Sequence, residues 1–273
     1  MLSEQIELLG KGLYTKSGIP DILTLKSIPT ATELDYVGAE DFDKTMLNNI
    51  LPNSIEETIP FGELLAIDYY WICRGLRMLS YGPYYTTSSI FCSKCREVSY
   101  GEYRVDLRSI ACKPLPESFV NDITIPHTEF LDFKKDIHIS LLTINEHLAK
   151  ENDTMFQDAK GNMNRTLAHV CYSIKRIGDR PVTPLDAKAT IEREMSAADY
   201  VILKELSHEH LNYGLASGGR TSCPKCGNTD AAFMALIDDK FFRPTVGDLK
   251  QWKSDNNDSR KTENISRGSS NSV

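Results

Sequence analysis

Cys92-Ser-Lys-Cys95 and Cys223-Pro-Lys-Cys226 are the two stretches that decide which fold we expect for this chain. In each of them two residues separate a pair of cysteines. Such a turn lets both thiolates point to one centre while backbone N–H groups donate to the sulfurs, and two turns supply the closed tetrahedral shell of a structural zinc site. We therefore predict that Cys92, Cys95, Cys223 and Cys226 together bind one structural Zn²⁺ ion.

The separation of the two pairs leaves alternatives open. About 130 residues lie between them, whereas about 15–20 separate the pairs of a compact zinc ribbon. The cysteines could instead be unligated thiols in tight turns. Two redox motifs fit less well, because neither pair opens a helix after a strand. For the remaining cysteines we expect buried, structurally inert side chains; these are Cys73, Cys112 and Cys171.

The segments around the cysteine pairs predict an α+β fold. The strongest helical pattern runs from Phe61 to Ser80, and the Tyr-Gly-Pro sequence after it ends the helix. Capping residues at Thr183 and Ser196 predict two further helices. Alternating segments predict strands at 85–91, 97–107, 123–133, 137–144 and 231–237. We expect helical and antiparallel β segments joined by a structural zinc knuckle pair with four cysteine ligands.

We expect three regions along the chain. Residues 1–30 are rich in turn-forming residues and predict an extended N-terminal arm. Residues 31–248 form the zinc-stapled body, either as one unit or as two lobes, 31–145 and 146–248. Within residues 249–273, the stretch beyond Trp252 has one isoleucine in about twenty residues, which is too little apolar surface to offset the entropy of ordering. This last region is therefore predicted to be a disordered tail.

Charge, hydrophobicity and the first residues of the chain disfavour several classes of protein. The net charge of −7 at pH 7 disfavours binding to nucleic acid, whose binding domains are usually basic. No run approaches the ~20 apolar residues of a membrane helix. The stretch Met1-Leu-Ser-Glu-Gln does not resemble a signal peptide, so we expect synthesis in the cytoplasm, where thiols stay reduced.

The remaining chemical signals do not predict an active site. Phosphate-binding, dinucleotide-binding, nucleophile-elbow and metalloprotease motifs are missing from the sequence, so we expect a non-enzymatic protein without a small-molecule substrate. His208 and His210 would face different sides of a helix. Asp68 falls on the apolar face of the predicted 61–80 helix, where we expect a structural hydrogen bond. Glu192 and Glu194 are weaker catalytic candidates.

Several short segments of this sequence, taken in their order along the chain, resemble those of a known protein family. They are Leu9-Gly-Lys-Gly-Leu-Tyr14, residues 25–38, Gly62-Glu-Leu-Leu65, Leu76-Arg-Met-Leu-Ser-Tyr-Gly82, the first cysteine pair, the second cysteine pair and Phe241-Phe-Arg-Pro244. In this order they resemble the baseplate hub family of T-even-type contractile-tailed bacteriophages. Residues 114–179 contribute nothing to the resemblance.

The resemblance implies a structural or assembly subunit near the centre of the baseplate, acting by protein–protein contacts. Its partners would be other phage tail and baseplate proteins, without nucleic acid, membrane or small-molecule ligands. It would reside in the virion after assembly in the host cytoplasm. The alternative is a zinc-ribbon nucleic-acid-binding or transcription-associated factor, which would need basic residues around the cysteine pairs. The sequence offers Lys94, Arg96, Arg220 and Lys225 there.

Overall fold

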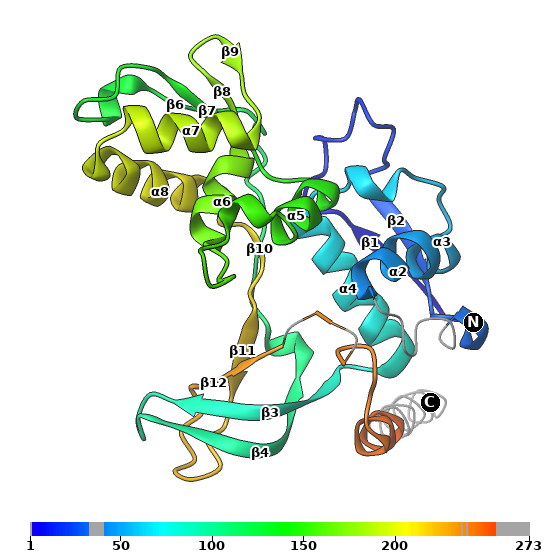
Figure 1. Ribbon diagram of the computed structural model, residues 1–273. Coiled ribbons are helices and arrows are strands. Elements are labelled where there is room, and N and C mark those ends of the chain that lie inside the picture. The colour runs from blue at the N-terminus through cyan, green and yellow to red at the C-terminus, as the bar shows by residue number, and fades with distance from the viewer. Residues whose placement is uncertain (1, 33–40, 236, 239, 255–273) are drawn as a thin grey trace, which may run out of the picture.

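The computed structural model describes residues 2–32, 41–235, 237–238 and 240–254. It has both helices and antiparallel sheets, so the predicted α+β class is confirmed. Figure 1 shows three parts, which we call the N-terminal lobe (residues 2–83), the ribbon (84–106 with 218–235) and the insertion lobe (123–211). None of the helices in the described ranges has the length and apolar character needed to cross a membrane.

The N-terminal lobe is built on a β-hairpin packed against a long helix. Strand β1 (Ser3–Glu7) pairs antiparallel with β2 (Ile22–Lys26), and the hairpin contacts helix α4 (Ala66–Tyr81). Leu23 and Leu25 are fully buried there. Gly75 allows this close approach, since a Cβ on it would lie 2.9 Å from Leu25 Cδ1. The region that we expected as an extended arm is therefore part of the core, because alternate residues of β2 face α4.

The long helix α4 begins at Ala66, later than the predicted start at Phe61, and short helical turns precede it. Leu64 and Leu65 are extended (ψ 140° and 141°). The Leu64 carbonyl accepts from Ile144 N at 2.7 Å, and Ala66 N donates to the Leu142 carbonyl at 2.9 Å, so this stretch pairs with the chain of the insertion lobe. The turns are α2 (Phe42–Thr45), the π-helical η1 (Met46–Ile50), α3 (Leu51–Ser54) and the 3₁₀ turn η2 (Phe61–Glu63).

The ribbon is an antiparallel sheet made from two hairpins that are distant in the sequence. Its strand order is β11-β12-β3-β4, with register Phe91↔Ala232 joining the hairpins. The strands are β3 (Tyr84–Cys92), β4 (Glu97–Asp106), β11 (Gly218–Thr221) and β12 (Ala231–Met234).

The insertion lobe lies between the two ribbon hairpins in the sequence. A short antiparallel pair, β5 (Cys112–Lys113) with β10 (Gly214–Leu215), joins the chain leaving the ribbon to the chain returning to it. The expected lobe division at residues 145 and 146 falls inside helix α5. The sheet has the order β6-β7-β8-β9 (Ile123–Ile125, Ile137–Ile139, Ile174–Ile177, Arg180–Pro181), and the helices are α5 (Ile144–Glu151), α6 (Arg165–Ser173), α7 (Pro184–Glu194) and α8 (Ala197–Leu211). The 3₁₀ turns of this lobe are η4 (His127–Glu129) and η5 (Thr154–Phe156), and a further one, η3 (Leu107–Ser109), follows β4.

Side-chain caps start α7 and α8 where the sequence predicts them, whereas α5 begins at Ile144, where the sequence predicts a strand over 137–144. Thr183 and Asp186 form a reciprocal capping box at α7, and Ser196 caps α8 by accepting from Asp199 N at 3.1 Å. The buried Asp199 carboxylate also accepts from the backbone N–H groups of the loop 131–133. These bonds replace strand pairing there, so the strand expected over 123–133 ends at Ile125.

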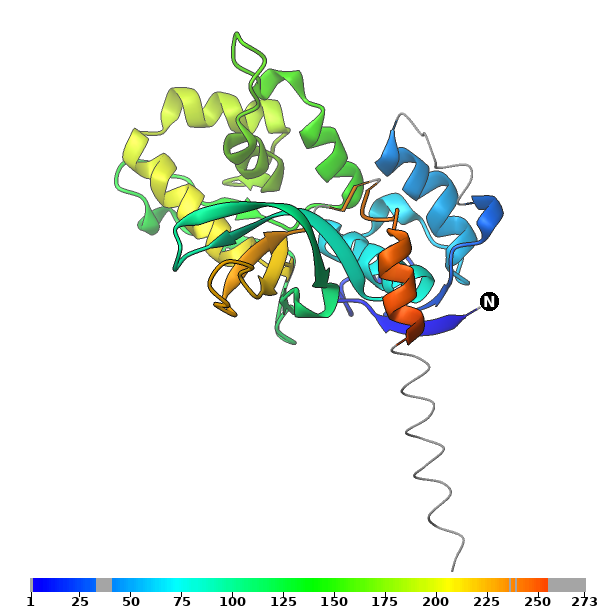
Figure 2. The ribbon, with the colours of Figure 1, turned by 90° about the horizontal axis from the view of Figure 1, so that it is seen from below.

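The chain from residue 246 to 254 is a helix beside the end of α4 (Figure 2). Thr245 and Asp248 cap it reciprocally, with N–H···O distances of 2.9 and 3.1 Å. Trp252 lies against Gly82, where an added Cβ would come within 2.4 Å of the indole. Residues 249–254 are thus helical rather than part of a tail, because local capping and one aromatic contact outweigh their polar composition. Residues 255–273, also placed in the expected tail, lie outside the described residues.

Candidate metal centre

The topology of the ribbon brings the two cysteine pairs to one end of the sheet. Cys92 ends β3, and Cys95 lies in the turn that leads into β4. Cys223 and Cys226 lie in the loop between β11 and β12. Because β12 runs antiparallel to both β3 and β11, this loop and the β3–β4 turn meet at the same end.

The sulfur positions fit a tetrahedral metal site. Cys92 Sγ lies 3.7 Å from Cys226 Sγ, and Cys95 Sγ lies 3.9 Å from Cys223 Sγ, a residue 128 positions away. All four Sγ atoms lie within 4.8 Å of one another. A tetrahedron with zinc–sulfur bonds of about 2.3 Å has edges of about 3.8 Å. A disulfide would need about 2.05 Å, and the cysteines are free thiols. The predicted cluster of Cys92, Cys95, Cys223 and Cys226 is present.

Backbone geometry shapes both turns in the same way. The residue after each second cysteine has a positive φ, 56° at Arg96 and 69° at Gly227. This conformation folds the chain back at the end of each turn. Cys95 N donates to Cys92 Sγ at 3.5 Å, and Gly227 N donates to the Cys223 carbonyl at 2.9 Å. A glycine after the second pair is visible in the sequence, whereas Arg96 in the first turn gives no such signal.

Asn228 is a site residue that sequence reasoning missed. Its Nδ2 donates to Cys92 Sγ at 3.7 Å, and its carbonyl accepts from Cys223 N at 2.8 Å. It therefore joins the second turn to a sulfur of the first. Lys225 and Glu97 form a second link as an exposed ion pair between the turns. Short polar side chains one residue past a Cys-x-x-Cys-Gly turn could have been marked as candidates for this role.

The electrostatics of the cluster favour a cation. The N–H of Cys95 lowers the pKa of the Cys92 thiol to about 6, whereas the neighbouring Cys226 sulfur raises the pKa of Cys95 to about 12. Four adjacent thiolates repel one another unless a positive ion lies between them. Among the residues described, this cluster is the group with metal-ligand spacing. The arrangement therefore constitutes a possible metal site with four sulfur donors.

The other cysteines and carboxylates lie elsewhere. Cys73 and Cys171 are fully buried, and burial raises the pKa of Cys171 to about 12, while Cys112 is partly exposed in β5. Glu192 and Glu194 form ion pairs with Lys188 and Lys135 on the surface, at 2.6 Å each. None of these groups contributes to the cysteine cluster.

Asp68 and the histidines do not contribute to it either. The buried Asp68 accepts hydrogen bonds from Leu9 N, from Gly10 N and from the Tyr14 hydroxyl, at 2.5, 3.1 and 2.5 Å. Its predicted structural role agrees with these bonds, which attach the loop after β1 to α4. His208 and His210 lie in the last turn of α8.

Comparison with known proteins found no matching family model, no matching curated protein and no matching solved structure.

Proposed function

We propose that the ion held by Cys92, Cys95, Cys223 and Cys226 is Zn²⁺ and that its role is structural. Four thiolates in a tetrahedral arrangement are a typical donor set for zinc, and they leave no coordination position for a substrate. The ion would join the ends of two hairpins between which the whole insertion lobe lies. Elemental analysis of the purified protein is expected to give one zinc per chain. No metal, two zincs or stoichiometric iron would contradict the assignment.

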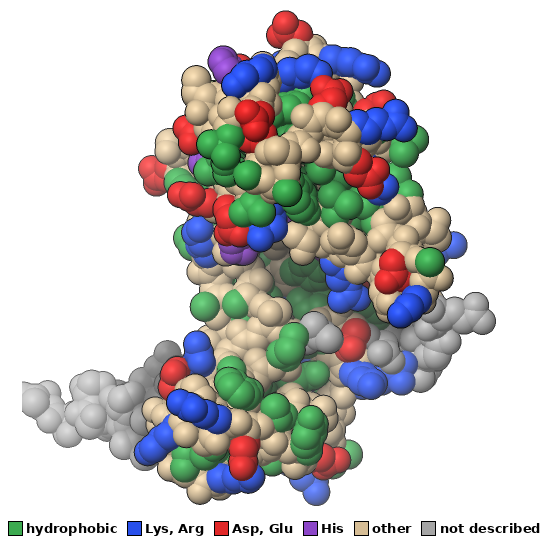
Figure 3. All heavy atoms as spheres, turned by 60° about the vertical axis from the view of Figure 1, so that its left-hand side comes forward, with side chains coloured by type: hydrophobic (Ala, Val, Ile, Leu, Met, Phe, Trp, Pro, Cys, Tyr) green, Lys and Arg blue, Asp and Glu red, His purple; other side chains and the backbone are tan. Residues whose placement is uncertain are grey.

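We propose further that the protein is a structural or assembly component of the central hub region of a bacteriophage tail baseplate, acting by protein–protein contacts. The observation that carries this proposal is the outer face of the ribbon. Phe91, Val98, Tyr100 and Met234 are 48%, 43%, 82% and 60% exposed. Figure 3 shows hydrophobic side chains on the surface of the ribbon, in the lower part of the view.

The register makes these side chains one continuous patch, which we call the ribbon face. Phe91 lies opposite Val98 on one side and Ala232 on the other, and Met234 follows two residues later on the same face. Aromatic and methionine side chains are enriched in the cores of protein interfaces. A metal bound at the end of the sheet would stiffen this surface. The order of sequence segments that resembles baseplate hub proteins supports phage tail proteins as the partners.

Affinity purification from infected cells tests this function. We expect the tagged protein to recover hub or other baseplate proteins and to be detected in assembled virions. Recovery of host proteins unrelated to the tail would contradict the proposal. The tag belongs at the C-terminus, so that β1, which begins at Ser3, is left unmodified.

A nucleic-acid-binding ribbon is the second candidate, favoured by aromatic side chains next to basic ones. Lys94 and Arg96 are exposed in the first cysteine turn. However, Lys225 already pairs with Glu97, and Arg220 pairs with Asp230 at 3.4 Å. These ion pairs leave little positive charge for phosphates. Recovery of nucleic acid, lost steeply as salt rises, would favour this candidate over the first.

A further inference from the structure

A groove runs along the outer edge of β1, on the side of this strand that faces away from β2. Its volume is about 590 Å³, and it lies between β1, helix α4 and the chain at 114–117. Residues 4–9 form one wall of the groove. The apolar and aromatic side chains of its floor and opposite wall are Ile6, Leu25, Trp71, Met78 and Leu115.

Strand β1 presents unpaired backbone groups to this groove. The Leu2 carbonyl accepts from Ser27 N at 2.9 Å, and Leu8 N donates to the Asp21 carbonyl at 2.8 Å. Because β-strand hydrogen bonds alternate in direction, residues 2, 4, 6 and 8 bond toward β2. The backbone groups of Ser3, Gln5 and Glu7 therefore point the other way.

Trp71 shows that this outward edge faces the groove. Its indole N–H donates to the Glu7 carbonyl at 3.1 Å, so an α4 side chain reaches the edge of β1 and caps its last outward carbonyl. Within the described ranges, no other hydrogen bond is formed by the backbone of Ser3 or Gln5 toward this side. An open strand edge beside an apolar floor is the arrangement that receives a strand from another chain.

The charges of the groove indicate the character of that strand. Glu4 and Glu117 line it and make no ion pair with any residue of the described part of the chain. Glu7 is paired with Lys11 at 3.2 Å. Arg74 is already engaged, with its guanidinium over the Trp71 ring and its Nε bonded to the Leu107 carbonyl at 3.3 Å. Arg74 keeps its positive charge in these contacts, so the lining carries three acids (Glu4, Glu7 and Glu117) against two bases (Lys11 and Arg74). This net negative charge complements a basic segment.

We propose that the groove binds an extended segment of a partner protein, in which apolar and basic residues alternate, by adding it as a strand to the edge of β1. The proposal rests on the proposed function for the identity of the partner, since it names a second surface, besides the ribbon face, through which a docking subunit would engage it. The backbone of Ser3 and Gln5 supplies the pairing, the apolar floor receives alternate side chains, and Glu4 and Glu117 attract the basic ones.

The test uses the full-length protein and a fluorescein-labelled peptide, Lys-Val-Lys-Val-Lys-Val-Lys. Two derivatives of this peptide carry N-methyl groups on the backbone. In the first derivative every valine is methylated, and in the second every inner lysine is methylated. Each derivative therefore lacks the N–H donors along one edge of the peptide strand, while its charge is unchanged. We expect the parent peptide to bind in an anisotropy titration and one derivative to bind at least tenfold more weakly. Hydrogen exchange of the amides at Ser3 and Gln5 is expected to slow when the parent peptide binds. Equal binding of all three peptides would mean charge attraction alone and would overturn the proposal.

A pair of variants tests the protein side. Gln5→Pro removes the outward N–H without removing a bond to β2, whereas Gln5→Ala keeps that N–H. We expect at least tenfold weaker peptide binding for the first and unchanged binding for the second. Equal binding by both variants would contradict the proposal. If Gln5→Pro lowers the melting temperature, its weaker peptide binding reflects unfolding as well as the lost N–H. The binding of the N-methylated peptides to the native protein then tests the proposal without a variant.

Partner capture separates this inference from the function on which it rests. If Gln5→Pro and Gln5→Ala recover phage tail proteins equally well, the groove is not the docking surface, although the proposed function stands. If the peptide binds at β1 as expected but cells yield no tail protein, the groove stands as a strand-binding site and the proposed function fails.

Discussion

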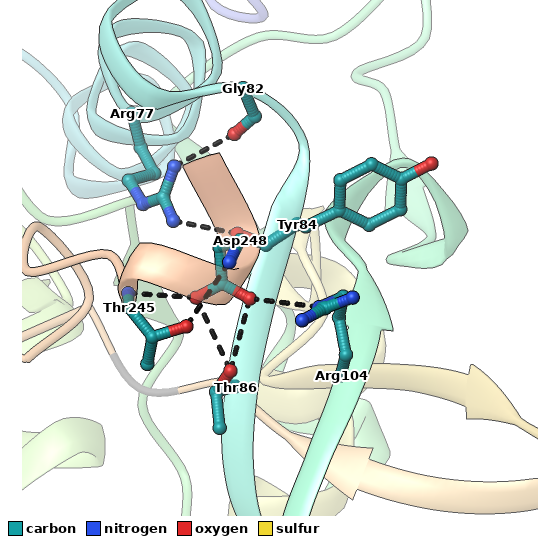
Figure 4. A network of polar contacts seen from close by, with 7 residues as sticks. All are labelled: Arg77, Gly82, Tyr84, Thr86, Arg104, Thr245 and Asp248. Atoms are coloured by element: carbon teal, nitrogen blue, oxygen red, sulfur yellow. Dashed lines mark hydrogen bonds and ion pairs between the residues drawn. The ribbon is translucent and has the colours of Figure 1, made fainter. Parts of the chain in front are cut away.

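Arg77 donates from its Nε to the carbonyl oxygen of Phe241 at 2.7 Å, across 164 positions of sequence. Its two terminal nitrogens donate to the carbonyls of Gly82 and Tyr84, at 2.7 and 2.6 Å (Figure 4). The side chain is fully buried. A buried guanidinium is tolerated when its donors are bonded, so this one residue fixes where the chain after the ribbon meets the end of α4 and the start of β3.

Replacing Arg77 by methionine should therefore destabilise the protein strongly. Methionine fills similar space but leaves the carbonyls of Gly82 and Phe241 buried without their donor. We expect a loss of about 3–5 kcal/mol in the free energy of unfolding, measured in urea. Arg180→Met is the control, since this side chain is exposed and lies 3.8 Å from its acidic partner. Equal stability of both variants would show that the buried bonds contribute little.

Removing one cysteine sulfur should have an effect that depends on metal. We expect Cys223→Ser to lower the melting temperature by about 10 °C or more and to remove bound zinc. Cys112→Ser, in β5 outside the cluster, should change neither property. A strong chelator should lower the melting temperature of the native protein but leave that of Cys223→Ser unchanged. A chelator effect of equal size on both proteins would place the metal elsewhere.

Local signals in the sequence predict local features of this structure well. The cysteine pairs predict the sulfur cluster because each Cys-x-x-Cys turn specifies its own geometry and a closed tetrahedral shell needs two such turns. Thr183 and Ser196 predict the starts of α7 and α8, since a cap needs only the next three residues. The structural role of Asp68 is predictable because a carboxylate on an apolar helix face needs a partner. The partner, the loop at Leu9 and Gly10, could not be read from the pattern.

Features that depend on distant segments were not predictable from the sequence. Nothing near Arg77 indicates that Phe241 would supply a carbonyl, and nothing near Asp248 indicates that β3 and β4 would lie beside it. The insertion of a whole lobe between two ribbon hairpins depends on the pairing of β3 with β12, and strand patterns do not specify their neighbours. The N-terminal region shows the same dependence on a distant segment. The turn-rich composition of residues 1–30 predicts an extended arm, whereas in the structure alternate residues of β2 face α4.

Asp248 should hold the last described helix in place. Its carboxylate, 1% exposed, accepts from the Thr86 hydroxyl at 3.0 Å, from Arg104 Nε at 3.3 Å and from Thr245 N at 2.9 Å. We expect Asp248→Ala to cost about 2–4 kcal/mol, because these donors lose a buried charged partner. Hydrogen exchange should accelerate in residues 246–254. The exposed Asp230 provides the control Asp230→Ala, for which neither effect is expected.

Removal of residues 255–273 tests the expected tail. We predict that a chain ending at Ser254 keeps the melting temperature of the full protein, because it retains Asp248 and Trp252. A chain ending at Gly247 loses both side chains and should melt at a lower temperature. Thermal unfolding of both truncated chains beside the full protein measures this. A large drop for the first truncation would contradict the predicted boundary.

The pH dependence of stability should show the titration of Asp68. Burial raises the pKa of this carboxyl from 3.8 to about 6 in the folded protein. The folded state therefore binds the proton more tightly than the unfolded state, and the stability that this proton contributes is full below pH 4 and lost as the pH rises through 6. A pKa difference of about two corresponds to about 3 kcal/mol.

Asp68→Asn isolates this titration from that of the other groups. Between pH 4 and pH 7.5 the native protein should lose about 3 kcal/mol of unfolding free energy relative to the variant, because the asparagine does not titrate. Urea unfolding of both proteins across this range gives the difference directly, and the cysteines titrate equally in both. A constant difference across the range would mean that Asp68 has an ordinary pKa.

Substitutions on the ribbon face should separate docking from folding. Phe91 and Tyr100 are exposed, so the double variant Phe91→Ser, Tyr100→Ser removes apolar surface without opening the core, and we expect a melting temperature within about 2 °C of the native value. Recovery of tail proteins from infected cells should fall at least tenfold, since aromatic side chains dominate the energy of interfaces. Val201→Ser on α8, where the side chain is 51% exposed, is the matched control and should leave recovery unchanged. Unchanged recovery by the double variant would exclude the ribbon face as a docking surface and leave the edge of β1 as the proposed site of contact.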